Sequence, residues 1–214
     1  MNSIDKTIAF VKTTLLGAEA GHDWFHIERV YGLANKIAET EICQIKIVQY
    51  AALLHDIADS KFHDGDETLG PKKAREFLNT LNEQHSTIDQ VVKIIENISF
   101  KGGNFNQTFN SIELEIVQDA DRLDAMGAIG IARAFHFGGY KNRALFDPQI
   151  KPNLKMDKET YKNSQAPTIN HFYEKLLLLK GRMNTKTGQS LAENRHEYML
   201  GFLAQFKDEW YQKI

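Results

Sequence analysis

The spacing of apolar residues constrains the fold of this chain more than any other feature. Apolar residues recur at intervals of three and four through most of the sequence, and sustained strand-like alternation is hard to find. This spacing gives each helix an apolar face that other helices can bury. We therefore predict an all-α protein, a helical bundle. The predicted helices cover approximately residues 3–18, 23–39, 43–58, 70–81, 85–98, 110–124, 126–137, 167–181 and 186–212.

Loop composition separates these helices. Gly, Asn and Asp are concentrated in residues 63–70, 101–108 and 138–153. The irregular stretch from about 138 to 166 is the longest, and such stretches in compact domains tend to be lids or mobile segments. No internal repeat or shift in composition marks a domain boundary. We therefore expect the 214 residues to form a single domain over 1–214.

Composition and charge limit the cellular location and the kinds of binding partner that we expect. No apolar segment approaches the roughly 18 residues needed to span a bilayer, so no membrane partner is expected. A formal net charge of −2 gives no general attraction to nucleic acid, and none is expected as a partner. Cys43 is the single cysteine, and the first 17 residues lack the cationic start of a secretory signal. These features favour a cytoplasmic location and leave the oligomeric state open.

The dipeptide His-Asp occurs twice, in two different contexts. His55-Asp56 lies near the carboxyl end of a predicted apolar helix, whereas His63-Asp64 lies in loop composition with no periodic pattern around it. A helix end is the better scaffold for a rigid site. The simplest interpretation of His63-Asp64 is a solvated loop, with a position near the substrate as the alternative.

Further metal-ligating side chains lie before and after His55-Asp56. His22 and His26 are four residues apart on one predicted helical face, and Asp121 lies on an otherwise apolar helix. Burying a carboxylate is costly unless it is paired. Two imidazoles and two carboxylates would hold one divalent ion, and these donors suit Mn²⁺, Fe²⁺, Co²⁺, Ni²⁺ or Zn²⁺ better than Mg²⁺. The alternative is that the groups pair with each other, or Asp121 with Arg122.

In the order His26, His55-Asp56 and Asp121, the chain resembles the HD-domain metal-dependent phosphohydrolase superfamily, whose pattern is H…HD…D. The resemblance favours His26 over His22, because His26 precedes "IERV". The segments "HDWFHIERV", "LLHDIADSKF" and "VQDADRLDA" look like a bacterial branch of nucleotide pyrophosphohydrolases. The resemblance implies one catalytic divalent ion, with Mn²⁺ favoured. It also implies a metal site built from about residues 22–124 with C-terminal helices, about 167–212, packed on it.

The resemblance further implies the reaction and its ligand. Nucleoside triphosphates would be hydrolysed to monophosphate and pyrophosphate by attack of a metal-activated water, so the partner is a phosphorylated small molecule of the nucleotide type. Asp59, three residues after Asp56, is predicted to orient or deprotonate that water. Lys61 is predicted to act in catalysis and to bind the phosphates. The alternatives are a solvated helix-end acid and an exposed loop lysine.

Other cationic side chains are candidates for substrate binding. Lys101 precedes two glycines, and Arg133 lies near the end of a predicted helix, so either side chain could bind phosphate. Ordinary surface positions are the alternative for both. Asp124 is interpreted as a capping residue, or as a contact to the metal ligands or a sugar. Arg195 and His196 recur in the resembling proteins, and a structural role is open for them.

Three other functions remain open from the sequence. They are a nucleotidase that removes a terminal phosphate, a hydrolase of the alarmone type, and a non-catalytic nucleotide-sensing module. A two-iron centre would need further histidines between the central His-Asp and the final Asp. Only His63 and His85 occur between residues 57 and 120, so one metal ion is the prediction.

Overall fold

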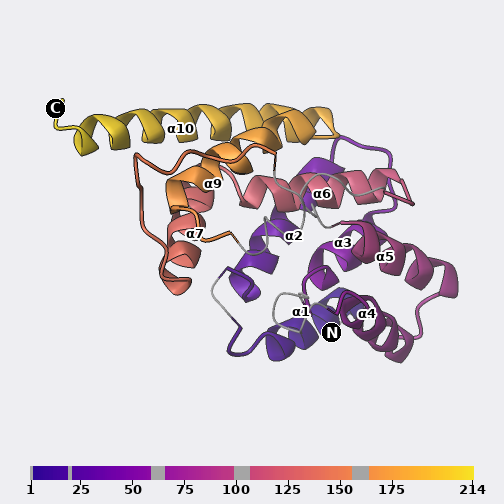
Figure 1. Ribbon diagram of the computed structural model, residues 1–214. Coiled ribbons are helices and arrows are strands. Elements are labelled where there is room, and N and C mark those ends of the chain that lie inside the picture. Colours follow the sequence, from indigo (N-terminus) through magenta and orange to yellow (C-terminus); the bar gives the residue numbers. More distant parts are fainter. Residues whose placement is uncertain (1, 19–20, 59–65, 99–106, 156–163) are drawn as a thin grey trace. The chain divides into compact units, whose positions relative to one another are not determined.

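The computed structural model describes residues 2–18, 21–58, 66–98, 107–155 and 164–214. These residues form α-helices and one 3-10 helix with no β-strand among them, which confirms the all-α prediction (Figure 1). Within these ranges no helix is both long and apolar enough to cross a bilayer. By their contacts, the described residues divide into two compact units with the boundary between Ala120 and Asp121. The single-domain organisation stays a prediction.

The first unit is built around one apolar helix. Its helices are α1 (Ser3–Thr14), α2 (Trp24–Ala38), α3 (Ile45–Leu54), α4 (Leu69–Thr80), α5 (His85–Asn97) and most of α6 (Ile112–Asp124). Helix α3 packs against α1, α2 and α5, and every residue from Tyr50 to Leu54 is buried. A helix that is apolar on all sides belongs in the interior. Because α3 is buried among its neighbours, the position of its carboxyl end is fixed within the first unit.

Polar side chains anchor the start and the middle of α3. The Tyr50 hydroxyl donates to Glu83 Oε1 at 2.5 Å, and Lys46 Nζ donates to Glu83 Oε2 at 2.8 Å. Burial, together with the hydrogen bond to Glu83, raises the pKa of Tyr50 to about 12, so the phenol remains a donor at neutral pH. The backbone N–H of Gln44 donates to Glu113 Oε1 at 2.9 Å. Helix α3 is thereby tied to the α4–α5 turn and to α6.

Capping side chains lie at two of the predicted helix starts, near residues 23 and 110. Asp23 Oδ1 accepts from the backbone N–H of His26 at 3.0 Å, and Ser111 Oγ accepts from the N–H of Leu114 at 3.2 Å. The predicted end of the first helix at residue 18 is wrong. Helix α1 ends at Thr14, and Gly17 takes a positive φ of 78° in the turn that follows.

The second unit contains α7 (Gly127–Tyr140), α9 (Thr168–Glu174), the 3-10 helix η3 (Leu176–Arg182) and α10 (Lys186–Trp210). The long helix α10, yellow in Figure 1, packs against α7 and η3. Aromatic rings fill this unit. Phe172 is fully buried, and its ring centre lies 6.0 Å from that of Phe135 and 5.9 Å from that of Phe202. The unit thus has an apolar core of its own.

The prediction of one continuous α-helix over 167–181 is wrong. Helix α9 ends at Glu174, Lys175 has φ −141° and ψ −59°, and the chain continues as η3. Leu176 and Leu179 are the buried residues of η3. Their spacing of three matches the three residues per turn of a 3-10 helix. An apolar spacing of three is common to both helix types, so the sequence did not distinguish them.

The helix predicted over approximately 126–137 is present as α7, which continues through two glycines to Tyr140. Gly138 does not terminate the helix. A Cβ atom at this position would lie 2.1 Å from Thr168 Oγ1 at the start of α9. The glycine therefore permits a close approach between α7 and α9 that any larger residue would block.

Replacing Gly138 with alanine is expected to lower the free energy of unfolding by about 1–3 kcal/mol, because the added methyl group overlaps Thr168. Gly139→Ala is the matched control. A Cβ at Gly139 meets nothing within 4 Å, so this change is expected to stabilise α7 by about 0.5–1 kcal/mol. Urea unfolding followed by far-ultraviolet circular dichroism measures both. Shifts of the same sign and size would contradict the close approach.

Candidate metal centre

Three potential metal ligands converge in the first unit. His26 Nε2 lies 3.3 Å from His55 Nε2 and 3.9 Å from Asp56 Oδ2. One ligand atom from each of the three residues lies within 4.8 Å of the others. Within the described part of the chain, this is the one group of three such side chains. The structure therefore brings together three of the four predicted metal ligands.

The ends of two packed helices position these side chains. His26 is in the first turn of α2, where the Asp23 cap holds its backbone N–H, and its side chain is buried. Helix α3 packs against α2 and ends at Leu54, which places His55 and Asp56 directly after its last turn. The predicted continuation of this helix to residue 58 is wrong, because residues 55–58 form turns. Both candidate ligands therefore lie just after the end of α3.

A backbone carbonyl sets the orientation of the His55 ring. His55 Nδ1 lies 2.9 Å from the carbonyl oxygen of Ala52. A carbonyl only accepts hydrogen bonds, so Nδ1–H is the donor and the opposite ring nitrogen, Nε2, lies 3.3 Å from His26 Nε2. This orientation leaves Nε2 as the ring atom that would bind a metal. A hydrogen bond from the other ring nitrogen to a backbone carbonyl is usual for histidines that bind metals.

The separation of the two histidine nitrogens fits a divalent ion. Metal–nitrogen bonds of about 2.1 Å at angles between 90° and tetrahedral place two nitrogen ligands about 3.0–3.4 Å apart. The separation of 3.3 Å between His26 Nε2 and His55 Nε2 lies in this interval. Asp56 contributes a carboxylate, whose negative charge offsets part of the charge of the ion. Two imidazole nitrogens and one carboxylate oxygen thus form a donor set for a transition-metal ion.

The other predicted ligands and catalytic residues are placed less fully. Asp121 is half-buried in α6 and belongs to the second unit, and its role as the fourth ligand stays a prediction. Asp59, Lys61 and Lys101 lie outside the described residues.

His22 is a neighbour of the metal centre. Its ring centre lies 6.2 Å from that of His26 with the rings edge-on, so His22 lies beside a predicted ligand. The second His-Asp pair, His63-Asp64, lies outside the described residues. The structure thus assigns a converging arrangement to the first pair and leaves the second pair untested.

Asp124 and Arg133 form an ion pair in the second unit. Arg133 Nη1 lies 2.7 Å from Asp124 Oδ2, and Asp124 is buried. Arg195 Nη1 donates to the carbonyl oxygen of Leu123. Burial lowers the pKa of Arg195, and the charge of Asp124 opposes that shift. The spacing of residues in the sequence could not reveal the contact of Arg195, since Arg195 and Leu123 are 72 residues apart. Phosphate binding by Arg133 stays a prediction.

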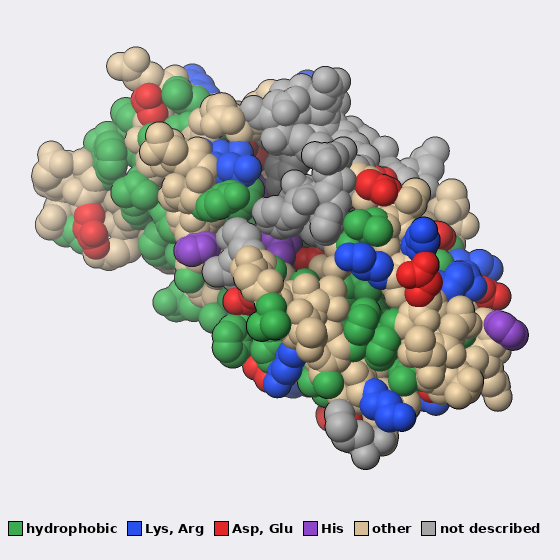
Figure 2. Space-filling model, turned by 90° about the horizontal axis from the view of Figure 1, so that it is seen from below, with side chains coloured by type: hydrophobic (Ala, Val, Ile, Leu, Met, Phe, Trp, Pro, Cys, Tyr) green, Lys and Arg blue, Asp and Glu red, His purple; other side chains and the backbone are tan. Residues whose placement is uncertain are grey.

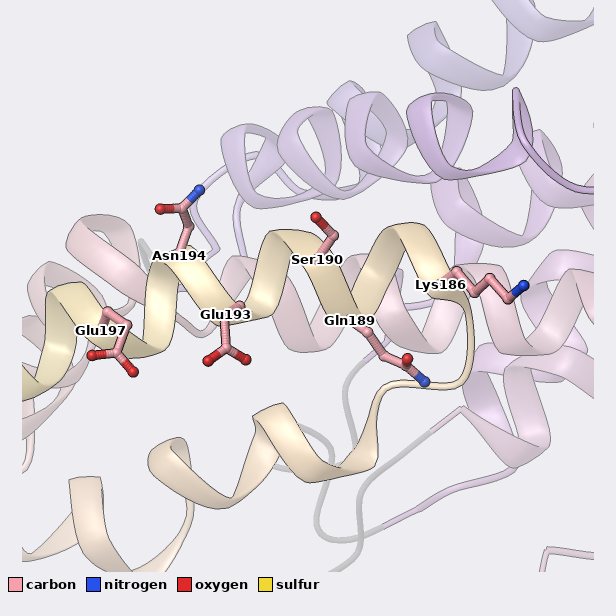
Figure 3. Close-up of a pocket in the computed structure, with 6 residues that line it drawn as sticks. All are labelled: Lys186, Gln189, Ser190, Glu193, Asn194 and Glu197. Carbon is pink, nitrogen blue, oxygen red and sulfur yellow. The ribbon is translucent and has the colours of Figure 1, made fainter.

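A surface depression lies along α10 in the second unit. Figure 3 shows that Ser190 and Asn194 point to one side of the helix, whereas Gln189 and Glu193 point to the other. The residues that line it all come from this helix: Lys186, Gln189, Ser190, Glu193, Asn194 and Glu197. Side chains that diverge in this way do not form a binding site.

Surface charge is mixed where it is visible. On the face seen in Figure 2, basic and acidic side chains lie side by side. This agrees with the small net charge of −2. Among the described residues visible on this face, the basic side chains do not gather into a broad patch.

Known proteins of the same architecture identify the family. The family model for the HD domain matches residues 24–126. The solved structure of an HD-superfamily hydrolase from Bacillus thuringiensis is 44% identical and covers 97% of this chain and 96% of its own, with a TM-score of 0.77. The chain belongs to the HD-domain superfamily. The predicted superfamily is therefore confirmed, whereas the metal-ligand role of His26, His55 and Asp56 stays a prediction.

Two other relatives match almost the full length of the chain. A solved structure from Lactobacillus plantarum is 34% identical, covers 99% of both chains and has a TM-score of 0.85. The Bacillus subtilis protein YpgQ is 38% identical in sequence over 94% of this chain and 90% of YpgQ. Its crystal structure in complex with ADP superimposes with a TM-score of 0.76 and covers 97% of each chain. The HD-superfamily hydrolase fold therefore extends beyond the segment that carries the ligands.

Proposed function

We propose that this protein is a metal-dependent phosphohydrolase that hydrolyses nucleoside triphosphates to a monophosphate and pyrophosphate. The observation that carries the proposal is the convergence of His26, His55 and Asp56 at the junction of α2 and α3 in an HD-superfamily chain. Asp121 completes the proposed ligand set. Mn²⁺ is the proposed ion, because it accepts both imidazole nitrogen and carboxylate oxygen. When bound, such an ion lowers the pKa of water and polarises a phosphoryl oxygen.

The side chains around the ion have distinct proposed roles. His26 and His55 supply neutral nitrogen donors, and the Ala52 carbonyl keeps the lone pair of His55 on Nε2. Burial of His26 shields that side of the site from bulk water. Asp59 is proposed to orient or deprotonate the attacking water, and Lys61 to bind the phosphates. Lys101 and Arg133 are proposed as further phosphate ligands.

A nucleotide is the ligand that the comparisons support best. YpgQ has been crystallised in complex with ADP, and it shares the fold of this chain over almost its full length. The release of pyrophosphate, rather than of a single phosphate, is proposed from the resemblance of the segments around the ligands to the pyrophosphohydrolase branch. A cytoplasmic location remains the expectation from the sequence.

The test is a product assay with purified protein, Mn²⁺ and a panel of ribonucleoside and deoxyribonucleoside triphosphates. Ion-exchange chromatography is expected to show equal amounts of monophosphate and pyrophosphate. In water enriched in oxygen-18, the label is expected in the monophosphate, because attack occurs at the α-phosphorus. Diphosphate with orthophosphate would support a nucleotidase instead. Nucleotide binding without any product would support a sensing module.

A further inference from the structure

Asp124 is a buried charge in the second unit that the proposed reaction does not use. Its carboxylate is 2.7 Å from Arg133 Nη1, and its side chain is 2% exposed, whereas that of Arg133 is 21% exposed. A buried carboxylate persists only with a partner, because removal from water penalises its charge. The Asp124–Arg133 pair joins the last residue of α6 to α7.

Arg195 reaches the same turn from α10. Its Nη1 donates to the carbonyl oxygen of Leu123, which also accepts from the backbone N–H of Met126 at 3.0 Å in the turn after α6. At the corner between α6 and α7, Gly127 has φ 69°, and a Cβ there would lie 3.1 Å from Arg195 Cγ. The aliphatic part of Arg195 therefore lies over the corner, and its guanidinium caps the helix end.

These contacts hold the last turn of α6 from two directions, through α7 and through α10. Asp121 lies in the same turn, three residues before Asp124. The ends of helices fray when their terminal groups are not held. A ligand on such an end binds a metal well only if its position is fixed before the metal arrives.

We propose that Asp124, Arg133 and Arg195 form a clamp that fixes the last turn of α6 and so holds Asp121, the proposed fourth ligand, in a defined position. In this clamp Asp124 is a positioning residue and does not touch the ion. The inference rests on the proposed function in one respect, because it takes Asp121 as the fourth ligand. The clamp also explains why the second unit contains the buried carboxylate of Asp124.

The test measures Mn²⁺ affinity alone, by electron paramagnetic resonance titration of the free ion. Asp124→Asn is expected to weaken binding about 10–100-fold, the usual effect of removing a partner that supports a ligand. Asp121→Asn is also expected to weaken binding. Because the clamp acts through Asp121, the double variant D121N/D124N should bind Mn²⁺ as weakly as Asp121→Asn does.

Arg75→Gln is the matched control. Arg75 forms an ion pair of the same 2.7 Å length with Asp89, on the surface of the first unit. Its loss is expected to leave Mn²⁺ affinity unchanged. If circular dichroism shows that Asp124→Asn is unfolded, Arg133→Gln replaces it in the same cycle, since the Arg133 side chain is partly exposed.

Three results would overturn the clamp. They are an unchanged affinity in Asp124→Asn, a further loss when this change is added to Asp121→Asn, and wild-type affinity in Asp121→Asn. Nucleotide hydrolysis is assayed separately on the wild-type protein. If the variants change Mn²⁺ affinity as expected but the wild-type protein hydrolyses no nucleotide, the proposed function is rejected and the clamp is kept. If the wild-type protein hydrolyses nucleotides but the variants do not change Mn²⁺ affinity as expected, only the clamp is rejected.

Discussion

Replacing His55 with alanine is expected to abolish tight Mn²⁺ binding and, with it, nucleotide hydrolysis. His55 Nε2 is 3.3 Å from His26 Nε2, and its ring is already oriented by the Ala52 carbonyl. Loss of a supporting partner costs about 10–100-fold in metal affinity, so loss of a direct ligand is expected to cost at least about 100-fold. Asp56→Ala should behave in the same way. Isothermal titration with Mn²⁺ and the product assay measure the two effects.

Two controls make this result specific. His85 is exposed at the start of α5, so His85→Ala removes an imidazole from the first unit without touching the metal centre. Metal content and hydrolysis are expected to remain at the wild-type level. Alanine changes at His63 and Asp64 should also leave the metal content intact. If these variants lost the metal while His55→Ala kept it, the first His-Asp pair would be the wrong one.

Replacing Phe172 with alanine is expected to lower the free energy of unfolding of the second unit by about 3–5 kcal/mol. Phe172 is fully buried on α9, and its ring contacts those of Phe135 on α7 and Phe202 on α10. Truncation therefore leaves a cavity where three helices meet. Urea unfolding, followed by Trp210 fluorescence in a Trp24→Phe background, reports this unit, because Trp210 stacks on Phe206 at 5.9 Å.

Tyr198→Ala on α10 is the control for the removal of an aromatic ring. Tyr198 is 59% exposed, so its truncation is expected to change stability by no more than about 0.5 kcal/mol. Similar losses in the two variants would show that the aromatic rings of the second unit are not packed as a core.

The helices were predictable wherever local signals mark them. The Asp23 and Ser111 caps mark the starts of α2 and α6, and both are confirmed. The glycine pair 138–139 was misinterpreted, because glycine ends helices and also permits close packing, and the sequence does not show which. The partner that decides between the two, Thr168, comes from a different helix.

The metal centre was predictable for a different reason. His26 and His55 are 29 residues apart, so no local rule joins them, and the family pattern supplied the connection. The contacts of Asp124 had no such guide. Its interpretation as a cap came from position alone, whereas the structure shows an ion pair with Arg133. Contacts between distant helices depend on packing, which a single sequence does not encode in its spacing.

The most direct test of the metal centre is a crystal grown with Mn²⁺ and measured at a wavelength that gives strong anomalous scattering from manganese. We expect one anomalous peak per chain, within bonding distance of His26 Nε2, His55 Nε2 and carboxylate oxygens of Asp56 and Asp121. A peak elsewhere would contradict this account. So would the absence of any peak, with the two imidazoles and the Asp56 carboxylate hydrogen-bonded to one another.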